Sequence, residues 1–192
     1  MLEWIGVYPE RPLMTQVSRL DPWKDPLRAI AVYRLAAARW QSLNRPWWAR
    51  WRSTILRAGP CAVRSALRTR ADPRIHVFAN VTGFGNVEVN ALQRLSRVVV
   101  QKSIREGFGL VVSEAPWKET PVVAGRAGGI KLQMADGVGG VSVDDLEGCA
   151  AAVVEWIRDR PRAEMPAERD RNRLLRGPEA FLGAALSPEA AR

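Results

Sequence analysis

The 192-residue sequence predicts an α/β domain built around a doubly wound parallel sheet. Two valine-rich runs, residues 98–101 and 121–124, are apolar except for Gln101, as is typical of parallel strands buried on both faces. A glycine-bearing turn follows each run, and helical patterns separate one expected strand from the next. Strands that alternate with helices form parallel sheets, whose ligands bind beyond the carboxyl ends of the strands.

The remaining elements follow the same alternation. A first strand is expected at 13–18 and a polar loop at 19–26, where Asp25 as N-cap and Pro26 at the first helical position favour a helix over 26–38. Beyond residue 70 the sequence predicts a strand at 75–79, a helix at 87–95, a strand at 98–101, a turn at 106–109, a helix to about 118, a strand at 121–124, a short strand near 141–143 and a helix at 146–157. His76, the single histidine, is expected to be a packed core residue rather than an acid or base.

The positive charge of the chain is concentrated in one segment. Eight arginines and no acidic residue lie between Arg39 and Arg70, so this segment supplies +8 of the formal net charge of +9. A basic segment with interleaved tryptophans would suit nucleic acid, and a nucleic-acid-binding insertion is therefore one interpretation. Because the rest of the chain is nearly neutral, we favour a protein without a nucleic-acid partner.

Cysteine content and hydropathy narrow the class of protein further. Cys61 and Cys149 are too few for a disulfide framework and lack metal-ligand spacing, which favours a cytoplasmic protein without a metal site. The start of the chain has no signal-peptide pattern, and no stretch approaches the roughly 20 apolar residues that span a bilayer. The sequence thus predicts neither a membrane partner nor a bound cofactor.

Three loops that follow predicted strands carry groups suited to a nucleotide diphosphate. Arg19 and Lys24 lie five residues apart in the first loop and could flank a pyrophosphate, or they could be two solvated surface cations. Glu106 and Glu114 enclose a glycine turn that opens a helix, where backbone N–H groups and the helix dipole attract phosphate. The competing interpretation is that Glu106 is a capping acid and Glu114 an exposed helix residue. The glycine-rich loop 125–130 could hold a sugar or only make a tight turn.

These motifs resemble the signature of family-4 retaining glycosyltransferases of the GT-B fold. The E-x7-E spacing within QKSIREGFGLVVSEA (101–115) carries the resemblance. The runs VSRLDPWKDP (17–26), GNVEVNALQRLS (85–96) and TPVVAGRAGGI (120–130) narrow it to glucosyl-transferring trehalose synthases and the related trehalose phosphorylases. The resemblance implies two facing Rossmann-like domains, a C-terminal one that binds the nucleotide-sugar donor and an N-terminal one that binds acceptor glucose.

On this resemblance the chain corresponds to the C-terminal half of a GT-B glycosyltransferase. Residues 1–12 would be a remnant of the interdomain linker, 13–158 the nucleotide-sugar-binding domain, and 159–192 a tail without assignment. The implied reaction transfers glucose from NDP-glucose to glucose, and the isolated chain is expected to be inactive because the acceptor domain is missing. The alternative within this class is a donor-binding module without turnover.

The resemblance also implies a role for each motif residue. Arg19 and Lys24 would neutralise the leaving diphosphate, and Glu106 would hold hydroxyls of the donor glucose. The donor-binding turn would comprise Gly107, with Phe108, Gly109 and Leu110 offering backbone N–H groups, and Glu114 would accept from the ribose hydroxyls. Retention by front-side displacement needs no covalent nucleophile, so leaving-group electrostatics would be the main contribution of this half.

Three features depart from the resembled pattern. Lys131 replaces a proline, and Pro116 is expected to kink the helix just past Glu114. Residues 39–70 should hold the second strand in a form like LVGSMALDDPEGWA, but they do not. Because tryptophan has the single codon TGG, reading the gene from the third base of each codon yields valine at Trp47–Trp48 and glycine at 48–49. We therefore predict a frameshift that is restored before Asp72, and expect this segment to supply no second strand.

Overall fold

The computed structural model describes residues 12–19, 21–42, 52–56, 72, 74–78, 85–134 and 139–159. Its strands form one six-stranded sheet in the order β3-β2-β1-β4-β5-β6, and every neighbouring pair is parallel. The direction of winding reverses between β1 and β4, which makes this pair the topological switch point of the sheet. The structure confirms the predicted doubly wound α/β fold.

Most elements lie close to their predicted positions. The strands are β1 (Leu13–Val17), β2 (Arg52–Leu56), β3 (Ile75–Phe78), β4 (Val98–Gln101), β5 (Val122–Ala124) and β6 (Gly140–Ser142). The helices are the short 3-10 helix η2 (Pro22–Lys24), α1 (Pro26–Ser42), α3 (Asn86–Leu95), α4 (Leu110–Trp117), α5 (Ile130–Gln133) and α6 (Leu146–Asp159). The one-turn helix α5 was not expected from the sequence.

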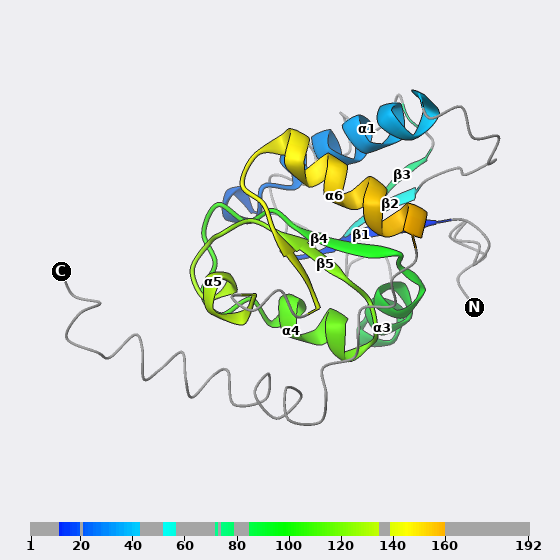
Figure 1. Ribbon diagram of the computed structural model, residues 1–192. Coiled ribbons are helices and arrows are strands. Elements are labelled where there is room, and N and C mark those ends of the chain that lie inside the picture. Colours follow the sequence, from blue (N-terminus) through cyan, green and yellow to red (C-terminus); the bar gives the residue numbers. More distant parts are fainter. Residues whose placement is uncertain are drawn as a thin grey trace.

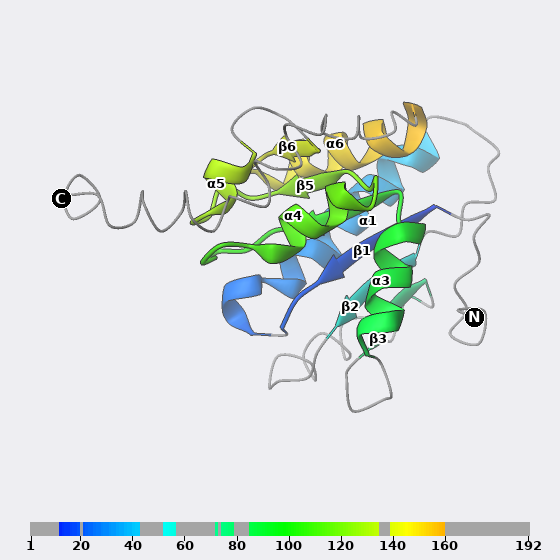
Figure 2. The same ribbon diagram turned by 90° about the horizontal axis from the view of Figure 1, so that it is seen from below.

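The helices cover both faces of the sheet. Figure 1 shows α1 and α6 side by side on one face, with α3, α4 and α5 on the other. Figure 2 views the molecule from the side of α3 and α4. Between α1, α6 and the sheet lies the largest apolar cluster, which includes the fully buried side chains of Met14, Tyr33, Val98 and Val153. Smaller clusters lie under α3 and under α4 with α5.

Helix α1 begins as predicted but continues past its expected end. Asp25 caps it, because the Asp25 Oδ1 atom accepts a hydrogen bond of 3.2 Å from the backbone N–H of Arg28. The helix extends to Ser42 rather than 38. Arg39 forms an ion pair with Glu147 of α6, and Trp40 packs against the core cluster. The first residues of the segment 39–70 therefore belong to the fold.

The prediction that residues 39–70 supply no second strand is wrong. Strand β2 pairs in register with β1 on one side and with β3 on the other, so it lies in the interior of the sheet. Its sequence RSTIL contains adjacent β-branched residues, Thr54 and Ile55, which favour strand conformation. An ordered strand here counts against the frameshift hypothesis. Residues 43–51 and 57–71, with Trp47, Trp48 and Cys61, lie outside the described part of the chain.

Two single-residue expectations can be placed in the structure. His76 stacks its ring on Phe78, with centroids 5.9 Å apart and planes 6° from parallel, so it is packed on β3, but it is half-buried and not the fully buried core residue that was expected. Pro116 lies in the last turn of α4, which ends one residue later at Trp117.

In the described part of the chain, no helix is both long and apolar enough to cross a membrane.

Candidate functional site

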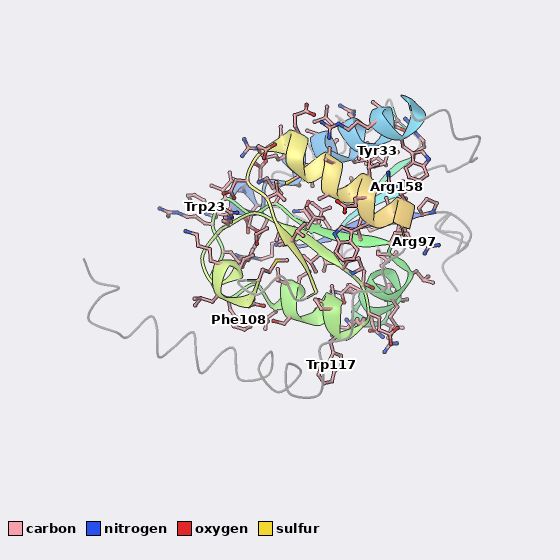
Figure 3. The ribbon with its side chains drawn as sticks, viewed as in Figure 1. Trp23, Tyr33, Arg97, Phe108, Trp117 and Arg158 are labelled. Carbon is pink, nitrogen blue, oxygen red and sulfur yellow. The ribbon has the colours of Figure 1, made fainter. Side chains whose placement is uncertain are left out.

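The loops that follow β1 and β4 meet at the carboxyl edge of the sheet. Since β1 and β4 are neighbours at the switch point, their outgoing loops border the position where doubly wound domains bind ligands. Figure 3 shows Trp23 of the first loop and Phe108 of the second at this end, with Arg97 and Arg158 at the opposite end. The two loops contain all but two of the site residues predicted from the sequence, and the remaining two, Leu110 and Glu114, follow in α4.

Backbone, aromatic and ionic contacts fasten the two loops to each other. The Trp23 carbonyl accepts hydrogen bonds from the backbone N–H groups of Ile104 at 2.7 Å and Arg105 at 3.2 Å. The Arg105 guanidinium lies over the Trp23 ring, 4.7 Å from its centroid, at a distance suited to a cation–π interaction. Lys24 Nζ lies 2.5 Å from Glu106 Oε2. These contacts join the two loops at the candidate site.

Glu106 is a nearly buried carboxylate with one oxygen fully used. Its side chain is 8% exposed, and its Oε2 atom accepts from Lys24 Nζ at 2.5 Å, Ser103 Oγ at 3.1 Å and Gln101 Nε2 at 3.3 Å. The nearby ammonium offsets the cost of removing the carboxylate from water. No residue of the described ranges donates to Oε1, so that oxygen can accept from a ligand.

Glycines of the third loop support the turn at Glu106. Gly128 has φ of +49°, and a Cβ atom there would lie 1.7 Å from the Glu106 carbonyl oxygen. A Cβ atom at Gly129 would lie 2.6 Å from the carbonyl oxygen of Gly107, which accepts the backbone N–H of Gly129 at 2.7 Å. The loop 125–130 therefore acts as a backbone support for residues 106–108, which is why it needs glycine.

All of the sequence-predicted site residues except Gly107 line one cavity of about 540 Å³. Helix α4 begins next to it, after Gly109 with φ of +86°, and the first N–H groups of a helix have no partner within the helix. The lining residues are Val17, Ser18, Arg19, Lys24, Gly85, Asn86, Val89, Gln101, Glu106, Phe108, Gly109, Leu110, Val111 and Glu114. Gly107 lines an adjoining hollow together with Trp23 and Arg105.

The two cations predicted for the site differ in their surroundings. The Arg19 side chain is 71% exposed and lies 3.3 Å from Asp21, whereas the Lys24 side chain is 13% exposed and held by Glu106. The N-terminal ends of α3 and α4 both reach the cavity, and each adds positive electrostatic potential. Cations, helix N-termini and carboxylates with a vacant oxygen suit an anionic ligand that also carries hydroxyl groups.

Glu114 is held by Gln93, a residue for which the sequence predicted no role. Gln93, on α3, is fully buried and donates from Nε2 to Glu114 Oε2 at 3.2 Å, while its Oε1 atom accepts from Lys118 Nζ. Burial lowers the pKa of Lys118, and the Glu114 carboxylate opposes this shift. Gln101 and Ser103 were also missed, although polar residues directly after the valine run of β4 were a signal for the site.

Comparison with known proteins gives one family and several close relatives. The family model described as glycosyl transferases group 1 matches residues 74–173. A trehalose synthase of Rubrobacter xylanophilus is 45% identical over 165 residues, which cover 80% of this chain and 37% of that protein. A trehalose synthase of Thermococcus litoralis is 36% identical over 184 residues, covering 90% and 42%. The chain therefore spans about two fifths of the length of these curated relatives.

Solved structures share the fold at low sequence identity. Anabaena HepE, determined in complex with UDP and glucose, superimposes with a TM-score of 0.67 at 19% identity, covering 97% of this chain and 50% of that one. TarM gives a TM-score of 0.71 at 17% identity, with coverages of 94% and 35%. Sucrose-phosphate synthase of Thermosynechococcus elongatus gives 0.65 at 22%, with coverages of 94% and 45%.

Proposed function

Because this chain belongs to the group 1 glycosyltransferases, we propose that it is the donor-binding domain of a retaining enzyme that transfers glucose from NDP-glucose to glucose. Its doubly wound sheet is that of one half of a GT-B glycosyltransferase. The observation that carries the proposal is the shared cavity at the switch point, where Arg19, Lys24, Glu106 and Glu114 come together.

The diphosphate of the donor would bind between the first loop and the start of α4. Lys24 offers a charge near the floor of the cavity, and exposed Arg19 can swing toward the ligand from its edge. Backbone N–H groups at Phe108, Gly109 and Leu110 stand where a helix N-terminus attracts phosphate. As the bond to the sugar breaks, negative charge grows on the diphosphate, and these groups stabilise it without reorganising.

The two glutamates would bind the two ends of the donor that carry hydroxyl groups. Glu106 has Oε1 available for the glucose hydroxyls, since its Oε2 atom is occupied by Lys24, Gln101 and Ser103. Glu114, about one helical turn past the start of α4, would accept from the ribose hydroxyls. Carboxylates accept such hydrogen bonds with charge assistance, which makes them stronger than neutral ones.

Acceptor glucose would be bound by a second domain, as the resemblance to trehalose synthases implies. Transfer requires donor and acceptor to be held in line, and that positioning accounts for a large part of the rate enhancement of such enzymes. We therefore expect the 192-residue chain to bind nucleoside diphosphates and to form no trehalose alone.

Calorimetric titration of the purified chain with ADP, UDP and GDP tests the proposal. We expect binding of at least one of them, weakened about tenfold in Glu114→Ala by loss of a charge-assisted hydrogen bond. Glu147→Ala, which removes an exposed carboxylate on α6, is the matched control and should bind like the wild type. Equal affinities for wild type and Glu114→Ala would refute the donor site. Trehalose made by the chain alone from NDP-glucose and glucose would refute its inactivity.

A further inference from the structure

Gln93 is a buried amide on α3 whose side chain hydrogen-bonds to two residues of the α4 region. Its Nε2 atom donates to Glu114 Oε2 at 3.2 Å, and its Oε1 atom accepts from Lys118 Nζ. We propose that Gln93 is a positioning residue that holds the Glu114 carboxylate for the ribose hydroxyls of the donor. This inference rests on the proposed function, because it assigns a support to a residue of that site.

The surroundings of the amide allow only one orientation. Turning the amide over would direct its NH2 group at the Lys118 ammonium and its carbonyl oxygen at the Glu114 carboxylate, so both contacts would become repulsive. An amide that is 0% exposed cannot exchange these partners for water, and leaving a buried polar group without a partner is destabilising. Gln93 therefore fixes the position of Glu114 Oε2.

The backbone of Gln93 is itself anchored. Its carbonyl oxygen accepts from Thr120 Oγ1 at 2.7 Å, and the preceding residue, Leu92, is fully buried against Leu13 of β1. The Gln93 amide is thus fixed relative to the sheet, and it in turn fixes the exposed side chain of Glu114 on α4. Among the residues that the structure describes, none other than Gln93 donates to Glu114, so the second carboxylate oxygen can accept from a ligand.

A fixed carboxylate binds better than a freely rotating one. An unrestrained glutamate side chain loses rotamer entropy when a ligand immobilises it. Here the hydrogen bond from Gln93 already restricts the Glu114 side chain in the folded protein, so a ligand that hydrogen-bonds to Glu114 loses less entropy on binding. A ligand without ribose hydroxyls gains nothing from it, and this difference separates positioning from a purely structural tie between α3 and α4.

The experiment compares two ligands across a small set of variants. The ligands are the nucleoside diphosphate that wild type binds best and its 2′,3′-dideoxy analogue. Gln93→Leu removes both side-chain contacts, and Gln93→Glu keeps an acceptor for Lys118 while opposing Glu114. Thr120→Val is the matched control, because it removes the bond to the Gln93 carbonyl and leaves the amide intact. Melting curves confirm folding of each variant.

We expect both Gln93 variants to weaken binding of the diphosphate about fivefold, as for loss of one hydrogen bond, and binding of the dideoxy analogue less than about twofold. Thr120→Val should lower the melting temperature and leave both affinities unchanged. In a Glu114→Ala background, Gln93→Leu should have no additional effect, because the residue that it positions is gone. Gln93→Glu retains the Lys118 contact and supplies the same comparison if the leucine variant does not fold.

Equal losses for both ligands, or no loss for either, would overturn the positioning role. If Glu114→Ala weakens binding while the Gln93 variants do not, the donor site stands and only this inference fails. If wild type binds no nucleoside diphosphate, the proposed function fails and the inference fails with it.

Discussion

Lys24 Nζ and Glu106 Oε2 lie 2.5 Å apart and join the loop after β1 to the loop after β4. The pair crosses the switch point of the sheet, with side chains that are only 13% and 8% exposed. Each residue neutralises the other before a ligand arrives. A bound diphosphate would therefore share an ammonium that is already in place, and Glu106 would keep a partner throughout.

Lys24→Met should cost the protein about 3 kcal/mol of unfolding free energy, since it leaves a nearly buried carboxylate without its cation. Combining it with Glu106→Gln should restore most of this loss, because the charge that needed compensation is removed while Gln101 and Ser103 can still donate to the amide oxygen. Urea denaturation of the four proteins measures the coupling. Additive changes in unfolding free energy would show that there is no coupling energy between Lys24 and Glu106.

Gly128→Ala should destabilise the domain severely. The new Cβ would lie 1.7 Å from the Glu106 carbonyl oxygen at a residue with φ of +49°, so either the loop or the turn at 106–108 must move. Gly107→Ala is the control, since a Cβ there meets nothing within 4 Å. We expect thermal unfolding to show a loss of several degrees at 128 and almost none at 107. Similar melting temperatures for both variants would contradict the support role of the third loop.

Tyr33 makes the fold sensitive to alkali. Burial raises its pKa to about 12 from the ordinary 10. The unfolded chain therefore loses this proton before the folded one does, and the stabilisation present below pH 10 is lost as the pH rises to about 12. Between pH 8 and 11, wild type should lose about 1 kcal/mol more unfolding free energy than Tyr33→Phe does. Urea denaturation of both proteins at pH 8 and 11 measures this difference. If wild type and Tyr33→Phe lost the same unfolding free energy between the two pH values, the role of Tyr33 would be contradicted.

Arg105→Met should loosen the two loops slightly. The substitution removes the guanidinium over the Trp23 ring, an interaction of about 0.5–1 kcal/mol at exposed sites, and keeps the backbone N–H that Trp23 accepts. Arg126→Met removes an exposed arginine elsewhere at the same edge and should leave stability unchanged. Denaturant midpoints followed by tryptophan fluorescence compare the two. Equal denaturant midpoints for both variants would show that the contact between Arg105 and the Trp23 ring does not stabilise the fold.

Elements with clear patterns could be predicted from the sequence. The valine runs gave β4 and β5, and the alternation of strands and helices gave the parallel sheet. Strand β2 was missed because its five residues lie between arginine- and tryptophan-rich stretches, and the frameshift hypothesis outweighed the β propensity of Thr54 and Ile55. Whether the gene contains a frameshift stays a prediction, and its nucleotide sequence tests it directly.

The candidate site shows a similar division. Glu106 and Glu114 could be found because their seven-residue spacing around a glycine turn is visible in the sequence. Gln93 could not, because a glutamine in an amphipathic helix has no signature, and only tertiary packing shows that its amide is fully buried against α4. The support from Gly128 was equally hidden, because it depends on two loops 22 residues apart in sequence meeting backbone to backbone.

The meeting of Gly128 with the Glu106 carbonyl also constrains how this domain can evolve. The contact involves only main-chain atoms on the side of residue 106, and these are the same whatever side chain stands there. A substitution at 106 therefore offers no room for a larger residue at 128, and a suppressor of Gly128→Ala would have to reshape one of the two loops. The requirement for glycine at 128 therefore comes from the backbone path at 106 and 107, and it holds whatever side chain residue 106 carries.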